Sequence, residues 1–258
     1  MTPSEKVKYI SNWIKAYVDQ MPSRAEALVI GISGGIDSSV SSTLSAMTGL
    51  KTIALSMPIK QKENQHDLSL KHQEWLVKNF KNVEGHTVNL DELFLAFSTS
   101  LSKFDNEHGM ANSRARLRMT TLYQVAAANK GIVVGTGNKV EDFGVGFYTK
   151  YGDGGVDISP IADLLKSEVY SLAKFHNINE EIINAKPTDG LWNDNRNDED
   201  QIGASYDEIE IAMFNDHKSE RDLSERDKEV LKIYKSFNSS NRHKMLPIPV
   251  CKIPKDYI

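Results

Sequence analysis

Four short apolar runs divide the first 135 residues of the chain, and none of them contains Lys, Arg, Asp or Glu. They lie at Ala27–Ile32, Thr52–Met57, His86–Leu90 and Gly131–Gly135. Runs of this kind are typical of strands that are buried on both faces of a parallel sheet. The segments between them repeat apolar residues at helical spacing, over 39–48, 67–80, 93–103 and 112–129. Strand and helix therefore alternate, which predicts right-handed crossovers and an α/β fold with a doubly wound parallel sheet.

Helices are also expected at the N-terminus and in the second half of the chain. Residues 2–5, Thr-Pro-Ser-Glu, fit a capping box with Pro at the first helical position. Residues 135–157 are rich in glycine and charge, and a long loop of this kind is more often functional than structural. The remaining expectations are a helix that Ser159-Pro160 caps and that ends near His176, a surface loop over 191–201, helices over 205–214 and 224–237, and an extended tail over 245–254.

Composition and charge indicate an ordinary globular protein. Apolar residues make up 40% and charged residues 26% of the 258 residues, which suits a single folded domain over 1–258 with helical additions to its sheet. The net charge is −4, from 31 basic and 35 acidic residues. Proteins that bind nucleic acid are usually basic along one face, so we expect no nucleic-acid partner.

The single cysteine, Cys251, excludes an internal disulfide and a multi-cysteine metal site. The first 20 residues lack the apolar core of a signal peptide, and no apolar run approaches the roughly 20 residues that cross a bilayer. We therefore expect a cytoplasmic protein with no membrane association.

The segment after the first apolar run has the composition of a phosphate-binding loop. It reads Gly31-Ile32-Ser33-Gly34-Gly35-Ile36-Asp37-Ser38-Ser39 and opens the first crossover helix. Its glycines permit a tight turn, so that N–H groups and hydroxyls face an anion at the positive end of the helix. It matches neither a Walker A loop nor a dinucleotide fingerprint. A carboxylate beside phosphates calls for a cation, so Asp37 is a candidate Mg²⁺ ligand. A glycine turn capped by serine is the simpler alternative.

This loop resembles the pyrophosphate loop of the N-type ATP pyrophosphatases, which cleave ATP between the α and β phosphates. The resemblance implies ATP as co-substrate, Mg²⁺ as cofactor and a Rossmann-like fold of the adenine nucleotide alpha hydrolase type. By itself the loop leaves the second substrate open, because GMP synthetase, asparagine synthetase, argininosuccinate synthetase and tRNA-modifying enzymes share it.

Five further segments, together with this loop, resemble the ammonia-dependent type of the NAD synthetase family in the same order along the chain. They are 114–119, 135–141, 150–155, 205–209 and 243–244. The resemblance implies a ligase of NAD biosynthesis: ATP adenylates the nicotinate carboxylate of deamido-NAD, and ammonia then forms the amide. AMP and pyrophosphate are the other products, and the implied assembly is a homodimer.

The resemblance also implies roles for individual residues. The expected ATP contacts are residues 31–38, Thr136, Lys166 and Thr188. The expected contacts of deamido-NAD are Arg116, Lys150, Asp157, His243 and Lys244. Asp153 is expected to bind ammonium and help deprotonate it, which makes Asp37, Asp153 and Lys166 the candidate catalytic residues. Asp37 and Glu141, at the ends of neighbouring predicted strands, are expected to share the Mg²⁺.

Most of these residues also have a simpler structural interpretation. Glu141 fits a solvated loop carboxylate, and Lys166 fits an exposed charge on a helix. Arg116 fits a basic helix face, since Arg114 and Arg118 flank it. Asp153 fits a turn residue between glycines, and the pair at 243–244 fits a charged tail.

The nitrogen donor is expected to be free ammonia. The chain has no room for a glutaminase domain, and Cys251 lies between prolines, which is a poor place for a nucleophilic thiol. A separate ammonia-supplying protein is a candidate partner.

Three other functions stay open on the sequence. One is amidation of nicotinate mononucleotide to NMN. Another is a tRNA-modifying ATP pyrophosphatase, which the net charge of −4 and the absence of paired cysteines disfavour. The third is a non-catalytic module that binds adenine nucleotides.

Overall fold

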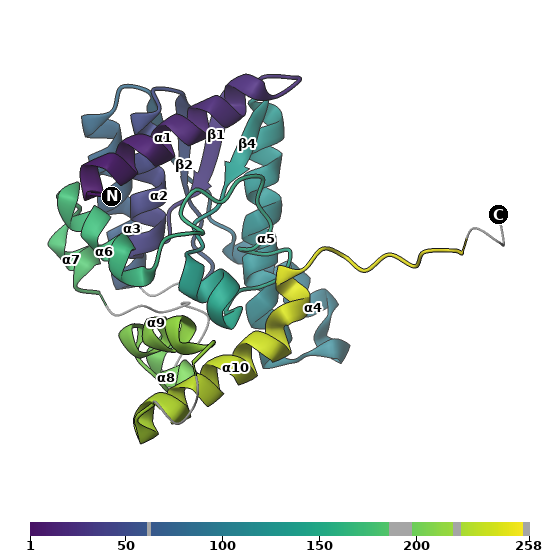
Figure 1. The fold of residues 1–258 in the computed structure, drawn as a ribbon. Helices are drawn as coiled ribbons and strands as arrows, with labels where there is room; N and C mark the ends of the chain where they lie inside the picture. Colours follow the sequence, from purple (N-terminus) through teal and green to yellow (C-terminus); the bar gives the residue numbers. More distant parts are fainter. Residues whose placement is uncertain (61–62, 186–197, 219–222, 255–258) are drawn as a thin grey trace.

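A four-stranded parallel sheet forms the centre of the computed structural model, which describes residues 1–60, 63–185, 198–218 and 223–254 (Figure 1). The strands are β1 Ala27–Gly31, β2 Lys51–Ser56, β3 Val83–Thr87 and β4 Gly131–Val134. Their order across the sheet is β3-β2-β1-β4, and every neighbouring pair is parallel. β1 and β4, which are far apart in sequence, therefore end side by side.

The helices follow the predicted alternation and extend it. They are α1 Pro3–Gln20, α2 Ile36–Met47, α3 Glu63–Asn79, α4 Asp91–Ser100, α5 Glu107–Ala128, α6 Lys166–Phe175, α7 Glu180–Ile183, α8 Asp198–Ile202, α9 Tyr206–Asn215 and α10 Glu225–Met245. A 3₁₀ turn, η1 Ser102–Phe104, follows α4, and a π-helical turn, η2 Val140–Val145, follows β4. The predicted capping box of α1 is confirmed: Thr2 N donates to Glu5 Oε2 at 2.7 Å, and Glu5 N donates to Thr2 Oγ1 at 3.3 Å.

Helices cover both faces of the sheet (Figure 1). Leu28 and Ile30 of β1 pack in one cluster with α1, α2, α3 and α6. Ala27 and Val29, which alternate with them, pack in a second cluster with α4 and α5. The predicted doubly wound α/β sheet is thus confirmed. A third cluster joins η2 to α8, α9 and α10, below the carboxyl edge of the sheet in Figure 1.

β3 lies three residues earlier than the predicted strand at His86–Leu90. It is an edge strand, and of its five residues only Val83 is buried. A continuous apolar run marks a strand that is buried on both faces, and the edge strand β3 lacks such a run.

The start of α6 corrects the predicted helix over 159–176. Ile158 pairs with Val134 beside β4, so the chain is still extended where the helix was expected to begin. The helix starts at Lys166, and Leu165 N donates to Glu168 Oε2 at 2.8 Å. Lys166 is consequently the first helical residue.

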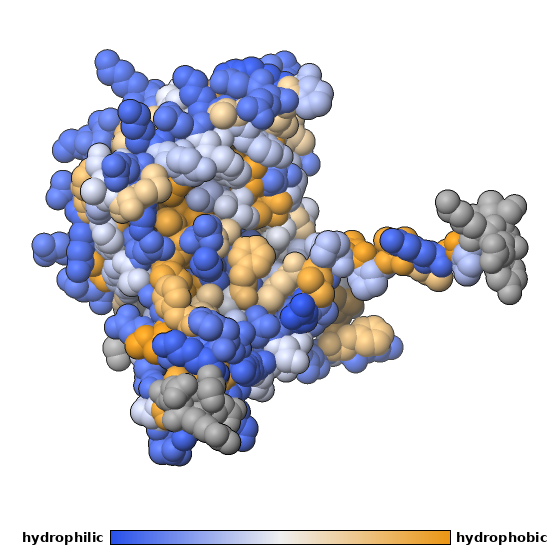
Figure 2. Space-filling model, viewed as in Figure 1, coloured by the Kyte–Doolittle hydropathy of each residue, from blue (hydrophilic) through white to orange (hydrophobic). Residues whose placement is uncertain are grey.

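Two expectations for the C-terminal third also need correction. Residues 191–197 of the predicted surface loop lie outside the described residues, and from Asp198 the chain is helical, with that side chain buried. α10 continues to Met245 rather than ending near 237. The segment 246–254 then points away from the body (Figure 1), and it carries exposed apolar side chains among polar ones (Figure 2). In the described part of the chain, every helix is too short or too polar to span a membrane.

Candidate active site

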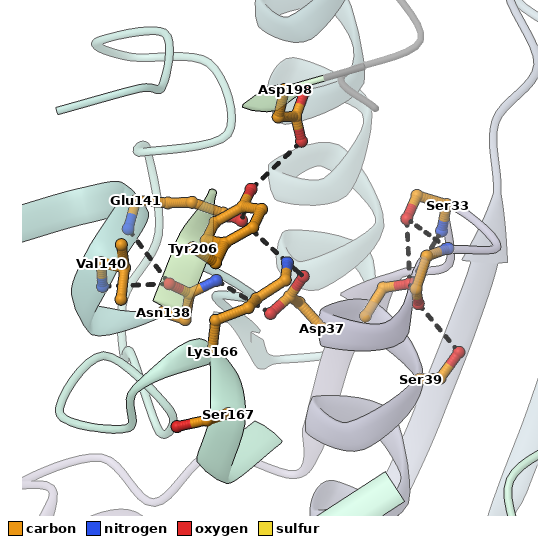
Figure 3. Close-up of polar contacts among 12 residues, drawn as sticks. Ser33, Asp37, Ser39, Asn138, Val140, Glu141, Lys166, Ser167, Asp198 and Tyr206 are labelled. Carbon is orange, nitrogen blue, oxygen red and sulfur yellow. Dashed lines mark hydrogen bonds and ion pairs between the residues drawn. The ribbon is translucent and has the colours of Figure 1, made fainter. Parts of the chain in front are cut away.

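The loop after β1 turns back onto the first turn of α2 (Figure 3). Ser33 Oγ accepts the N–H of Gly35 at 3.1 Å and lies 3.0 Å from Ser38 Oγ, which donates to Gly35 O at 2.9 Å. Gly34 has φ of +86°, a conformation that favours glycine. The N-cap residue of α2 is Gly35, which has no side chain to cap it, so the N–H groups of the first turn are available to an anion. The tight glycine turn and the serine contacts expected for this segment are present, and phosphate binding by it stays a prediction.

A buried ammonium links three separate elements at the carboxyl edge of the sheet (Figure 3). Lys166 Nζ, from the start of α6, lies 2.6 Å from Asp37 Oδ2 in α2 and 2.8 Å from Glu141 Oε1 in η2. Lys166 is only 2% exposed. Burial alone lowers the pKa of this amine, but the two carboxylates outweigh it and raise the pKa. Lys166 is therefore a buried cation, and Glu141 is a half-buried carboxylate that is paired with it, which overturns the exposed interpretations of both.

Asn138, which follows β4, holds both carboxylates in place. Its side-chain Nδ2 donates to Asp37 Oδ1 at 2.9 Å. Its Oδ1 accepts the backbone N–H groups of Val140 and Glu141, both at 3.0 Å, and so caps the π-helical turn that carries Glu141. Asn138 is fully buried. One amide thus connects the segments that follow β1 and β4.

Tyr206, at the start of α9, completes the enclosure of Lys166. Its hydroxyl donates to Glu141 Oε1 at 2.6 Å and lies 3.3 Å from Asp198 Oδ2. Its ring centroid is 4.8 Å from Lys166 Nζ. The sequence motif at 205–209 contains this tyrosine, but nothing in that motif indicates a contact with a carboxylate 65 positions earlier in the chain.

Asp37 and Glu141 also have the chemistry to flank a divalent cation. One oxygen of each carboxylate contacts the Lys166 ammonium. Hard oxygen ligands suit Mg²⁺, which is usually held by one or two carboxylates together with water and substrate phosphates. Among the described residues, no group of three or more His, Cys, Asp or Glu side chains is arranged to hold a metal by itself. Substrate phosphates and water would therefore be natural further ligands.

A cavity of about 160 Å³ opens beside this cluster. It is lined by both Asp142 and Asp153, with Gly137, Tyr148 and Lys244 among its other lining residues. Asp153 Oδ1 accepts the N–H of Thr149 at 2.9 Å, so this side chain stabilises its turn and also lines the cavity. Asp142 lies one residue beyond the motif at 135–141, so no sequence signal indicated a role for it. Its carboxylate lies so close to Gly137 that a Cβ on that glycine would clash with Oδ2.

The basic residues expected to contact the nucleotide gather around the loop 146–154. Lys244 Nζ donates to the carbonyl oxygens of Gly146 and Tyr148, both at 2.8 Å. Lys150 Nζ donates to His243 O at 2.8 Å, and Arg116 approaches Lys150 O at 3.4 Å. The pair at 243–244 belongs to the last turn of α10, so its interpretation as a tail is wrong.

The other expected residues are placed differently. Both carboxylate oxygens of Asp157 are engaged beside β4, Oδ2 by Val133 N at 2.7 Å and Oδ1 by Tyr123 OH at 3.0 Å. Thr136 is half-buried just after β4. Thr188 lies outside the described residues. Cys251 is exposed in the segment after α10.

Comparison with known proteins gives consistent matches along the chain. A family model described as NAD synthase matches residues 6–247. The NH(3)-dependent NAD(+) synthetase of Sulfurisphaera tokodaii is 34% identical over 95% of this chain and 88% of its own length. The structure of NMN synthetase from Francisella tularensis has a TM-score of 0.84 and 34% identity, and covers 99% of both chains. The NH3-dependent NAD synthetase from Campylobacter jejuni has a TM-score of 0.78 and 27% identity, and covers 98% of this chain and 100% of its own.

Asp142 predicts a pH dependence of stability. Burial, together with Glu141, Asp153 and Asp37, raises the pKa of Asp142 to about 8 in the folded protein. Between the unfolded pKa and that value, the folded state holds the extra proton, so the free energy of unfolding falls as the pH rises. Asp142→Asn cannot ionise and should be more stable than the wild type above pH 8. The gain should be at least about 1 kcal/mol and less than about 6 kcal/mol, the equivalent of roughly four pKa units.

Urea denaturation in EDTA, without nucleotide, at pH 5.5 and 8.5 measures this effect. Asp105→Asn, the same substitution at an exposed position, is the matched control and should leave the pH dependence unchanged. Equal pH dependence in the wild type and Asp142→Asn would show that this carboxyl titrates normally.

Proposed function

Since the chain belongs to the NAD synthase family, we propose that it converts deamido-NAD into NAD with ATP and ammonia. Its relatives are named as ammonia-dependent NAD(+) synthetases, which are ligases that form carbon–nitrogen bonds. The observation that best supports this activity is the phosphate-type loop beside the buried Lys166 cluster, at the carboxyl ends of β1 and β4. In open parallel sheets, ligands bind at this edge.

The chemistry has two half-reactions. A carboxylate is a poor acceptor for ammonia because its leaving group would be an oxide. An oxygen of the nicotinate carboxylate therefore attacks the α phosphorus of ATP, the bond to the bridging oxygen breaks, and pyrophosphate leaves. The lone pair of ammonia then attacks the acyl carbon of the adenylate. One proton is lost from nitrogen, and AMP leaves with the electrons of the carbon–oxygen bond.

The ATP phosphates would lie between the loop 31–38 and Lys166. The loop contributes N–H groups and hydroxyls, and Lys166 contributes a permanent positive charge, since its pKa is raised. Thr136 follows β4 at the same edge, and Thr188 completes the proposed ATP contacts. Asp37 and Glu141 would hold Mg²⁺, which neutralises phosphate charge when bound.

Deamido-NAD and ammonium would use the opposite side of the site. We assign the anionic dinucleotide to Arg116, Lys150, His243 and Lys244, because these basic residues gather around one loop. Asp157 is assigned only by family resemblance, and its carboxylate is already bonded to Val133 and Tyr123. Ammonium would enter the acidic cavity at Asp153, which would bind the cation and accept or relay its proton.

We also propose a single-domain, cytoplasmic protein that forms a homodimer. Leu93, Leu95 and Phe104, on α4 and η1, are 50%, 54% and 79% exposed. Exposed apolar side chains concentrated on neighbouring elements are typical of interaction surfaces. A second copy of the chain is the partner that the family resemblance favours, and a separate ammonia-supplying protein is a further candidate.

Amidation of nicotinate mononucleotide is the second candidate function. It is favoured by one observation, the similarity to the NMN synthetase of Francisella tularensis at 34% identity and a TM-score of 0.84. Both reactions act on the same carboxylate, so they differ only in how the rest of the nucleotide is held.

Purified protein with ATP, Mg²⁺ and ammonium should be offered deamido-NAD, nicotinate mononucleotide and xanthosine monophosphate separately. We expect amide product from deamido-NAD, with one pyrophosphate per amide, and glutamine should not replace ammonium. Mass spectrometry identifies the product. Efficient amidation of the mononucleotide alone would favour the second candidate, and glutamine-dependent turnover that Cys251→Ser abolishes would contradict the expected nitrogen source.

Asp37→Asn and Glu141→Gln should each lower kcat by roughly 100-fold or more at saturating Mg²⁺, because each removes charge from a proposed metal ligand with little change of shape. Steady-state kinetics with Mg²⁺ titration measures this, and thermal melting checks that the variants are folded. Near wild-type turnover of either variant would remove that residue from the metal site.

Asp153→Asn should slow amide formation more than adenylation. We expect a loss of roughly 100-fold in the ammonia-dependent step, the usual size of a general-base contribution. Exchange of labelled pyrophosphate into ATP, with deamido-NAD and without ammonium, reports adenylation separately and should change little. Asp163→Asn, whose side chain is 97% exposed, is the control. Equal loss in both half-reactions would contradict the proposed role of Asp153 in ammonium binding.

A further inference from the structure

Tyr206 of α9 contacts both charge types of the buried cluster. Its hydroxyl bonds to the Glu141 carboxylate at 2.6 Å, and its ring lies against the Lys166 ammonium at a centroid distance of 4.8 Å (Figure 3). Tyr206 is 6% exposed, so both contacts lie largely out of water. Charge-assisted hydrogen bonds are stronger than neutral ones, and cation–π contacts gain strength when they are desolvated.

The backbone of Tyr206 is held independently of its hydroxyl. Its N–H donates to Glu199 Oε1 at 2.9 Å, and the preceding Ser205 forms a capping box with Glu208. Glu208 also binds Arg226 of α10, at 2.7 and 3.0 Å. The start of α9 is therefore fixed by at least three contacts in which the phenol takes no part.

The packing of α9 against α6 also has its own polar contact. Glu210, one turn after Tyr206, accepts the N–H of Ser167 at 2.9 Å and its hydroxyl at 2.7 Å. Glu210 is 8% exposed, and a carboxylate at a helix N-terminus is favourable. Because Glu210 already joins the two helices, the hydroxyl of Tyr206 is not needed to dock them.

We propose that the Tyr206 hydroxyl is a positioning group for adenylation. The hydroxyl holds the Glu141 carboxylate, and hydroxyl and ring together hold the Lys166 ammonium, in the positions that the ATP phosphates require. The inference rests on the proposed function. Lys166 and Glu141 would touch ATP or its metal, and Tyr206 acts through them.

The expected effect follows from the geometry. Without the hydroxyl, Glu141 Oε1 loses the shorter of its bonds to Tyr206 and Lys166, and the carboxylate can rotate away from the Lys166 ammonium. Small displacements of catalytic groups cost rate because they lose alignment with the reacting atoms. Tyr206→Phe keeps the ring over Lys166 and removes only the hydroxyl, so it isolates this role.

Tyr206→Phe should lower kcat/KM for ATP by about 10- to 100-fold, the usual result of losing a hydrogen bond to a charged group. Pyrophosphate exchange should slow by the same factor, and the KM values for deamido-NAD and ammonium should stay within about twofold, since only the ATP side is disturbed. Tyr234→Phe removes a tyrosine hydroxyl from the same apolar cluster of α9 and α10 and should behave as wild type.

A binding measurement separates this inference from the proposed function. The affinity of Mg²⁺ with α,β-methylene-ATP, which cannot be cleaved between these phosphates, should fall at least about threefold in Tyr206→Phe by calorimetry. If the wild type binds the analogue but forms no amide, the proposed function fails. The inference about Tyr206 then depends only on whether Tyr206→Phe binds the analogue more weakly than the wild type. Unchanged affinity and exchange would overturn the inference. A lower melting temperature with unchanged ATP kinetics would also overturn it, because the hydroxyl would then be structural.

Discussion

The burial of one ammonium between two carboxylates is the constraint on which the site depends. The three charged side chains come from three elements, with Lys166 in α6, Asp37 in α2 and Glu141 in η2. Withdrawing any one of these charges from water would be unfavourable without the other two. Removing a charge from water costs several kcal/mol per ion, and only close pairing with additional hydrogen bonds offsets it. Asn138 and Tyr206 supply those additional bonds. The three elements must therefore meet in one register before the charges are satisfied, which ties the position of the site to the completion of the fold.

The sheet explains why residues so far apart meet. β1 and β4 are parallel neighbours, so the loops that leave them open at the same edge. This much followed from the sequence, since the alternation of apolar runs and helical segments predicted a parallel sheet, and the segments at 31–38 and 135–141 each followed a predicted strand. The proximity of Asp37 and Glu141 was predicted on that basis, and both carboxylates contact the same ammonium. β3 was misplaced because an edge strand is only partly buried and lacks the apolar signal of a central one.

Other parts of the site could not be read from the sequence, for physical reasons. The burial of Lys166 depends on partners 129 and 25 positions away, and nothing local distinguishes it from a lysine on a solvated helix. Tyr206 is a similar case, because an aromatic residue at the start of an amphipathic helix usually belongs to the core. The start of α6 was predicted too early because Ser159-Pro160 has the chemistry of a cap, whereas the tertiary pairing of Ile158 with Val134 keeps the chain extended there. At each of these positions, contacts between residues distant in sequence outweighed the structure that the local sequence favours.

The distribution of charge explains how one small site can serve reactants of both signs. The Lys166 cluster has one ammonium against two carboxyl groups, and Asp142 and Asp153 add two more carboxyl groups in the adjoining cavity. The raised pKa of Asp142, about 8, is an effect of burial first and of this crowding second. Such a region attracts cations, which suits both ammonium and the metal that accompanies a nucleotide. Lys150, Lys244 and Arg116 lie around the loop 146–154, and Lys244 also lines the acidic cavity, so basic groups that would favour an anionic dinucleotide adjoin the carboxyl groups that would favour ammonium. Under the proposed function, this close approach of opposite charges would bring ammonium next to the carboxylate that it converts, because each charged group attracts the reactant of opposite sign.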